Sequence, residues 1–143
     1  MNLYLDTSAL AKWYVAESDS EAFDAFIRDR AGARISRLTV VEMRCALGRR
    51  RRNGEISAAI EREAFGLFES HVRDGLLEVL TMQDAHFVGT LHIIEALRPI
   101  PLRTLDALHL AVARANKISA VATADQIMVR AAKALKFEIH EFH

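Results

Sequence analysis

The sequence has little of the material that stabilises secreted proteins or spans membranes. It contains one cysteine, Cys45, in 143 residues, which excludes an internal disulfide and a cysteine-based zinc site. The surrounding helical sequence is apolar, so we expect this thiol to pack in the interior rather than act as a nucleophile. No stretch approaches the ~20 apolar residues of a membrane span, and residues 1–6 lack the features of a signal peptide. These absences favour a cytoplasmic protein.

The chain also lacks net charge, because 19 Lys and Arg residues balance 19 Asp and Glu residues. An excess of positive charge often marks nucleic-acid-binding proteins, so the total gives that class no support. The positive charge is unevenly distributed along the chain, since four arginines stand together before Asn53-Gly54: Arg49, Arg50, Arg51 and Arg52. Cations are stabilised at the last turn of a helix, and arginines also suit forked contacts to phosphate. A solvated helix end and a nucleic-acid contact are therefore both open.

Short apolar runs alternate with longer helical segments, a pattern typical of an α/β domain around a parallel sheet. Because no stretch has the composition of a linker, we expect a single domain over residues 1–143. The strands are predicted near residues 2–5, 34–36, 76–81, 119–123 and 137–140. The helices are predicted near residues 8–16, 19–30, 38–53, 57–73, 83–97, 103–116 and 125–136.

Four carboxylates stand in apolar surroundings that would not normally hold a charge. Asp6 follows the run Leu3-Tyr4-Leu5, Asp125 follows the run from Ala120 to Ala124, and Glu42 and Asp106 lie within apolar helical sequence. A buried carboxylate without a partner costs several kcal/mol. In the predicted fold all four can reach the carboxyl edge of the sheet, where α/β proteins bind ligands. Their mutual repulsion there would make a divalent cation the natural counter-charge.

Helix capping is the simpler explanation for two of these residues. Asp at the start of a helix accepts hydrogen bonds from free backbone N–H groups, which is worth about 1 kcal/mol, and both Asp6 and Asp125 precede predicted helices. Ser8 could cap the first helix instead, which would leave Asp6 without that explanation. Thr7, Ser8 and Thr123 carry hydroxyls at the same predicted edge, where they could support a site or cap helices.

Capping does not explain Glu42 and Asp106. At 100° per residue Glu42 shares a helix face with Leu38, Val41 and Cys45. The helix around Asp106 is apolar except for Asp106 itself and His109, which lie three residues apart on one face. His109 could be a general base, a metal ligand or a partner that orients Asp106, and we favour a structural or orienting role.

Four segments carry a resemblance to a known family: Tyr4-Leu5-Asp6-Thr7-Ser8-Ala9-Leu10, then Ser36 to Glu42, then Leu105 to Ala111, then Val121 to Asp125. In this order and over essentially the whole chain, the sequence resembles PIN-domain proteins of the VapC toxin type. The resemblance implies an α/β fold with a five-stranded parallel sheet of order 3-2-1-4-5, flanked by helices. It also implies an acidic pocket that binds Mg²⁺ or Mn²⁺ and cuts RNA.

Carried over residue by residue, Asp6, Glu42, Asp106 and Asp125 become the catalytic, metal-binding tetrad, with every position filled. Thr7 or Ser8 and Thr123 match supporting polar positions. The resemblance further implies a metal-dependent endoribonuclease that acts as the toxin of a toxin–antitoxin pair in a prokaryotic cytoplasm. A homodimer, an RNA substrate and a cognate antitoxin that blocks the pocket are the expected partners, with no role for a membrane.

Three other classes with acidic or phosphate-binding sites fit the sequence less well. A receiver domain needs an Asp at the end of its third strand, where this chain has Leu80-Thr81-Met82-Gln83. A phosphatase of the haloacid dehalogenase type needs Asp-x-Asp after its first strand, and Asp6-Thr7-Ser8 lacks the second carboxylate. No glycine-rich phosphate loop is present. The alternative that stays open is a catalytically inactive PIN-fold module that binds RNA or protein.

Overall fold

The computed structural model describes residues 2–143, and its centre is a parallel sheet. The strands are β1 (Leu3–Leu5), β2 (Ala33–Ser36), β3 (Leu77–Leu80), β4 (Ala120–Thr123) and β5 (Glu138–Glu141). They lie in the order β3-β2-β1-β4-β5, and every neighbouring pair is parallel. The predicted sheet order is confirmed, and each strand boundary differs from its prediction by one residue at most.

The helices also follow the prediction, with one difference at the first of them. Where a helix over residues 8–16 is predicted, the chain forms the short α1 (Thr7–Leu10) and one 3₁₀ turn, η1 (Ala11–Trp13). The aromatic rings of Trp13 and Tyr14 pack against His71, so tertiary contacts override local helix propensity here. The other helices are α2 (Ser20–Arg28), α3 (Arg37–Arg52), α4 (Ala58–Arg73), α5 (Asp84–Ala96), α6 (Thr104–Ala115) and α7 (Gln126–Ala134).

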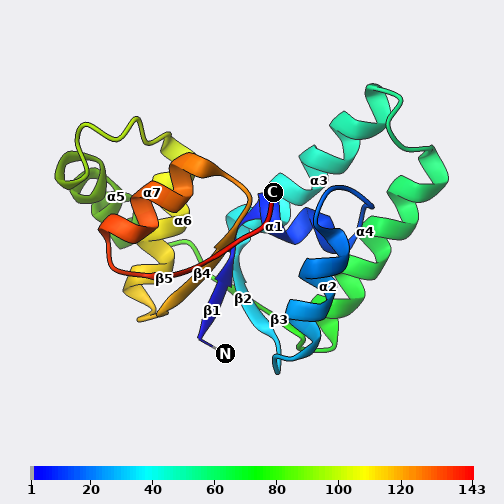
Figure 1. The fold of residues 1–143 in the computed structure, drawn as a ribbon, viewed down its shortest axis with the longest axis horizontal. Helices are drawn as coiled ribbons and strands as arrows, with labels where there is room; N and C mark the ends of the chain where they lie inside the picture. The colour runs from blue at the N-terminus through cyan, green and yellow to red at the C-terminus, as the bar shows by residue number, and fades with distance from the viewer. Residues whose placement is uncertain (1) are drawn as a thin grey trace.

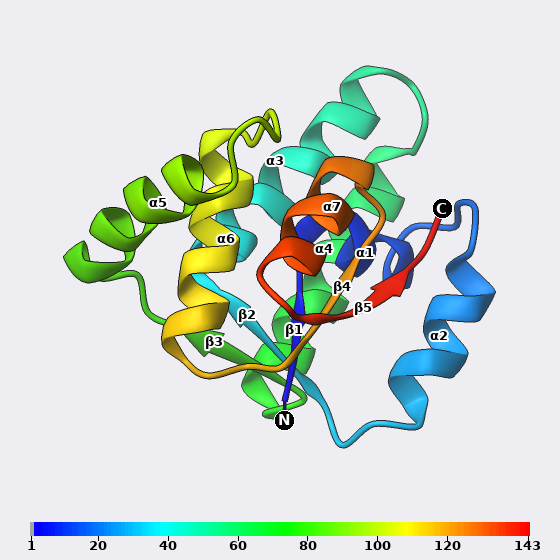
Figure 2. The same ribbon diagram turned by 60° about the vertical axis from the view of Figure 1, so that its left-hand side comes forward.

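The helices cover both faces of the sheet, with α1 to α4 on one side and α5 to α7 on the other (Figures 1 and 2). Successive strand residues point to opposite faces, so β1 contributes to both cores. Leu3 and Leu5 pack with α2, α3 and α4, whereas Tyr4 packs with Val112 of α6 and Val121 of β4. Among residues 2–143, no helix combines the length and apolarity needed to cross a membrane.

An aromatic cluster fixes the α3–α4 hairpin to the rest of the fold. Phe68 of α4 is 1% exposed and its ring centroid lies 5.7 Å from that of Tyr14. The Tyr14 hydroxyl is hydrogen-bonded to His71 Nδ1 at 2.7 Å, and Trp13 stacks on the same imidazole at 4.4 Å. On the outer side, Arg44 of α3 bonds Glu61 of α4. The position of α3 over the sheet therefore depends on α4.

Candidate functional site

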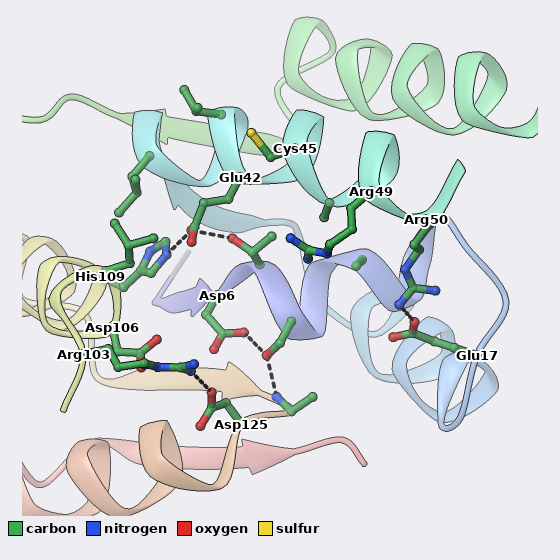
Figure 3. A pocket seen from close by; sticks show the side chains of 18 residues that line it. Asp6, Glu17, Glu42, Cys45, Arg49, Arg50, Arg103, Asp106, His109 and Asp125 are labelled. Carbon is green, nitrogen blue, oxygen red and sulfur yellow. Dashed lines mark hydrogen bonds and ion pairs between the residues drawn. The ribbon is translucent and has the colours of Figure 1, made fainter. Parts of the chain in front are cut away.

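A cleft of about 690 Å³ lies at the carboxyl edge of the central strands, between α3 on one side and α6 with the start of α7 on the other. Its lining includes Asp6, Glu42, Asp106 and Asp125, which come from four separate parts of the chain (Figure 3). The sheet topology explains their meeting, because β1 and β4 are neighbours and both end at this edge. The catalytic and metal-binding roles assigned to these four residues stay predictions.

Asp6 lies at the base of the cleft and is 4% exposed. Its Oδ1 accepts hydrogen bonds from the Ser8 hydroxyl at 2.7 Å and the Ala9 amide at 3.0 Å, and its Oδ2 accepts from Thr123 Oγ1 at 2.5 Å. Asp6 is thus the N-cap of α1, and the suggestion that Ser8 could take that role is wrong. Ser8 instead links Asp6 to β4, since its hydroxyl also accepts from the amide of Ala124.

Asp125 has two functions, one on each oxygen. Its Oδ1 accepts from the amides of Ile127 and Met128 and caps α7, as its position before a helix predicted. Its Oδ2 accepts from Arg103 at 2.7 Å, and the same guanidinium donates to Asp106 Oδ2 at 3.2 Å. Arg103 therefore bridges two of the four carboxylates on the α6 and α7 side of the cleft (Figure 3).

Glu42 is held by one oxygen only. Thr7 Oγ1 donates to Glu42 Oε1 at 2.7 Å, and His109 Nε2 is hydrogen-bonded to the same oxygen at 2.5 Å. Of the roles left open for His109, orienting Asp106 through a hydrogen bond is not what residues 2–143 show, because the carboxylate that His109 contacts is Glu42. His109 is buried beneath Glu42, whereas Asp106 turns toward Arg103.

Burial and partners shift the pKa values of three carboxylates in different directions. Burial raises the pKa of Asp6 despite the hydrogen bonds from Ser8, Thr123 and Ala9. Burial also raises the pKa of Asp106, against the opposing effect of Arg103. For Glu42 burial acts the same way, but the hydrogen bond and charge of His109, with the bond from Thr7, outweigh it and lower the pKa. Of these three carboxylates, Glu42 is the one whose ionised form the fold favours.

The four consecutive arginines at the end of α3 divide into two pairs. Arg49 and Arg50 line the cleft, and Arg51 and Arg52 do not. Arg50 bonds Glu17, and Arg51 pairs with Glu61. Arg49 forms no ion pair within residues 2–143 and points from α3 into the space above α1 (Figure 3). A solvated helix end accounts for Arg51 and Arg52, whereas Arg49 is free to contact a ligand.

The expectation that Cys45 packs in the interior is wrong, because the thiol is exposed and lines the cleft. The buried face of α3 carries Thr39, Met43 and Leu47, at intervals of four residues. Cys45 lies on the other face with Val41, which is 57% exposed. Leu38, Val41, Glu42 and Cys45 do share one face, as predicted, but that face forms an apolar wall of the cleft.

Sequence reasoning missed Arg103 and Tyr4. Arg103 precedes Asp106 by three residues at a helix start, a spacing at which opposite charges meet, and that signal was available. Tyr4 lies between two residues of a buried strand, and its hydroxyl reaches His109 Nδ1 at 2.6 Å. Because that contact spans 105 residues, the sequence carries no local sign of it.

The donor set of the cleft suits a hard divalent cation, since carboxylate oxygens are the ligands that Mg²⁺ and Mn²⁺ prefer. As the side chains stand, however, no three His, Cys, Asp or Glu residues among residues 2–143 converge as a ready metal site. Arg103 lies between Asp106 and Asp125 and is bonded to both carboxylates. The types and positions of the four carboxylates therefore fit a bound cation, provided that the Arg103 guanidinium moves out of the space between Asp106 and Asp125.

The PIN domain family model matches residues 3–134. A search of curated proteins found no significant match. The fold is similar to that of VapC20 from Mycobacterium tuberculosis, a Sarcin-Ricin loop cleaving toxin, at 15% identity and a TM-score of 0.72, covering 94% of this chain and 95% of the other. It is similar to DNA-bound VapBC from Salmonella typhimurium, at 20% identity and a TM-score of 0.69, covering 97% and 96%. It is also similar to FitAcB from Neisseria gonorrhoeae, at 15% identity and a TM-score of 0.69, covering 96% of this chain and 95% of the other.

Proposed function

The chain belongs to the PIN domain family, and from this premise we propose that it is a metal-dependent endoribonuclease, the toxin of a VapBC-type toxin–antitoxin pair. One observation carries the proposal. Four carboxylates from four parts of the chain line a single cleft with Arg49 at its rim. Such a cleft brings together groups that hold a hard cation and a group that binds phosphate. These are the requirements of phosphodiester hydrolysis.

In this proposal Asp6 and Asp106 hold the main Mg²⁺ or Mn²⁺ ion, and Asp125 completes the site. A bound divalent cation supplies Lewis-acid activation of water and neutralises charge on the phosphate. Glu42, with its lowered pKa, would either ligate the ion or accept a hydrogen bond from the attacking water and orient it. Ser8 and Thr123 hold Asp6 in place, and in-line attack by water leaves a 5′-phosphate and a 3′-hydroxyl.

The test is cleavage of total RNA by purified, antitoxin-free protein with Mg²⁺ or Mn²⁺, compared with the same reaction in EDTA. We expect discrete cuts that need the metal and carry 5′-phosphate ends. A 2′,3′-cyclic phosphate end would contradict the mechanism, because it means that the 2′-hydroxyl of the RNA attacked. Cutting that persists in EDTA would point to a contaminating nuclease.

Arg103 competes with the metal in this proposal, so Arg103→Gln should bind Mn²⁺ more tightly. Arg103 is 66% exposed, and exposed ion pairs contribute little, so we expect an affinity only ~2- to 5-fold higher. Isothermal titration with Mn²⁺ measures it. Arg98→Gln is the matched control, because Arg98 pairs with Glu95 at the same three-residue spacing away from the cleft. An unchanged or weaker affinity in Arg103→Gln would refute the competition.

Arg49 is proposed to contact an RNA phosphate. Arg49→Ala should raise KM for RNA several-fold and reduce the salt dependence of binding by ~0.7 in log–log slope, the value for one lost contact to a single strand. Arg52→Ala is the matched control, since Arg52 ends the same helix outside the cleft. KM measured over a series of salt concentrations distinguishes them. Equal effects of the two substitutions would mean that only the total charge of the helix end matters.

Two protein partners belong to this proposal. VapBC from Salmonella typhimurium was solved bound to DNA, and by analogy a cognate antitoxin would cover the cleft here. The exposed side chains of Val41 and Leu105 at its rim suit apolar residues of such a segment, while the carboxylates suit an arginine. We also propose a homodimer, in keeping with the exposed Phe87, Val88 and Leu91 of α5. The proposed compartment is a prokaryotic cytoplasm.

The alternative is a catalytically inactive PIN-fold module that binds RNA or protein. The ion pairs of Arg103 favour it, because they satisfy Asp106 and Asp125 without any metal. Metal-dependent turnover separates the two functions. A protein that binds RNA with the same affinity in Mn²⁺ and in EDTA, and that cuts none, would be the binding module.

A further inference from the structure

A chain of buried hydrogen bonds leads away from the cleft behind Glu42. His109 is 3% exposed and uses both ring nitrogens, with Nε2 bonded to Glu42 and Nδ1 bonded to the Tyr4 hydroxyl at 2.6 Å. Tyr4 in turn donates to the hydroxyl of Ser36 at 2.9 Å, and Ser36 is the N-cap of α3, the helix that carries Glu42. The chain of hydrogen bonds thus starts on α3, passes through α6 and β1, and ends at Ser36, the last residue of β2 and the N-cap of α3.

This chain leaves the Glu42 carboxylate oriented and half free. Thr7 and His109 both bond Oε1, and no hydrogen bond or ion pair reaches Oε2 from any of residues 2–143. An unrestrained glutamate side chain has several rotamers, and fixing it costs conformational entropy. Because two hydrogen bonds to Oε1 already fix the side chain, its conformational entropy is lost during folding and not again when a ligand binds. Oε2 is the oxygen left for the cleft, which Glu42 lines.

Packing alone does not require the polar atoms of Tyr4 and His109. Phe and Leu would fill similar space, and replacing both partners of a buried hydrogen bond by apolar groups can be nearly neutral. Tyr4 is 1% exposed, so little water reaches its hydroxyl, and this burial raises the pKa of that hydroxyl. Desolvating a hydroxyl and an imidazole has a cost, and within residues 2–143 the carboxylate of the cleft to which they are hydrogen-bonded is Glu42.

We propose that His109 and Tyr4 are positioning residues that aim Glu42 Oε2 into the cleft, toward the reacting water or a bound cation. The inference rests on the proposed function for what Glu42 does. His109 makes the direct contact, and Tyr4 fixes the tilt of the imidazole ring from behind. Outer contacts of this kind typically contribute 10- to 100-fold to metal affinity or activity.

Two substitutions of His109 separate positioning from packing. Glutamine places its amide nitrogen three bonds from Cβ, where His109 has Nε2, so His109→Gln keeps a donor for Glu42 and loses the contact to Tyr4. Asparagine places its amide nitrogen two bonds from Cβ, so His109→Asn keeps the contact to Tyr4 and loses Glu42. Both variants lose the ring, and we expect both to melt at similarly lowered temperatures.

We expect kcat for RNA cleavage in His109→Asn to fall ~10- to 100-fold with KM unchanged, and His109→Gln to recover most of that loss. The kcat of Tyr4→Phe should lie between those of His109→Asn and His109→Gln. The same order is expected for Mn²⁺ affinity measured by titration calorimetry without RNA. Equal losses of kcat in the two His109 variants would mean that His109 contributes only packing and would overturn the proposal. Wild-type rates in both variants would overturn it as well.

The Mn²⁺ titration also separates this inference from the proposed function. If the wild type cuts no RNA, the nuclease assignment fails, and weaker Mn²⁺ binding in His109→Asn than in His109→Gln still supports the positioning of Glu42. If the wild type cuts RNA but the two variants match each other in kcat and in Mn²⁺ affinity, the nuclease assignment stands and the positioning role is wrong.

Discussion

Replacing Asp106 with asparagine is expected to reduce RNA cleavage by ~10³-fold, because it removes one negative charge from the proposed cation site while keeping the size of the side chain. Initial rates in saturating Mn²⁺ measure the loss. Asp24→Asn is the control: Asp24 also pairs with an arginine, Arg28, but lies on α2 outside the cleft. Cleavage by Asp106→Asn within tenfold of the wild type would remove Asp106 from the proposed tetrad.

The same substitution should not weaken the metal-free fold. Burial raises the pKa of Asp106, so this group stabilises the fold fully below its unfolded pKa of about 3.9 and loses that contribution as pH rises through the folded pKa. At neutral pH the ionised carboxylate is therefore unfavourable. In EDTA at pH 7 we expect Asp106→Asn to melt at the wild-type temperature or above it, and the difference to shrink on acidification. A lower melting temperature at pH 7 would show that the bond to Arg103 dominates.

Replacing Phe68 with alanine should destabilise the protein by about 3–5 kcal/mol, the usual loss for a fully buried phenylalanine. Its ring packs against Tyr14 and Phe65 inside the cluster that joins α4 to η1. Domains have only about 5–15 kcal/mol of stability, so this is a large part of the total. Urea denaturation measures it as a shift of the midpoint.

Leu67→Ala is the control for Phe68→Ala, because Leu67 is the preceding residue of the same helix and is 49% exposed. We expect its midpoint to move little, which corresponds to a change in the free energy of unfolding of no more than about 0.5 kcal/mol. A small loss in Phe68→Ala would mean that α4 repacks around the cavity. Since α3 lies against α4, the support for Glu42 and Arg49 should be affected only by the Phe68 substitution.

Local sequence was enough to predict the sheet and the meeting of the acids. Residues 3–5 and 120–123 are apolar runs followed by Asp6 and Asp125, and a parallel sheet places such strand ends at one edge. Strand order came from the resemblance, and the structure confirms it. The roles of Asp6 and Asp125 as caps could also be predicted, because capping depends on neighbours only a few residues away.

Contacts made by long side chains could not be predicted in the same way. The shared helix face of His109 and Asp106 suggested that one could orient the other, but the hydrogen-bond partner of His109 is Glu42, 67 residues away. Periodicity identified the face of α3 that holds Cys45 but not whether that face meets the core or the cleft. In both cases the answer depends on how helices pack across the sheet, which a local pattern does not contain.

The long sequence separation within the sheet also sets the order in which the cleft forms during synthesis. The central strand β1 pairs on one side with β4, and Thr123 at the end of β4 holds Asp6 through a contact that spans 117 residues. A ribosome-bound chain that has been translated only as far as α6 contains Asp6, Glu42 and Asp106 but neither Thr123 nor Asp125. Such a nascent chain has an incomplete cleft. The proposed site therefore gains its last two groups only when β4 and the start of α7 have been synthesised.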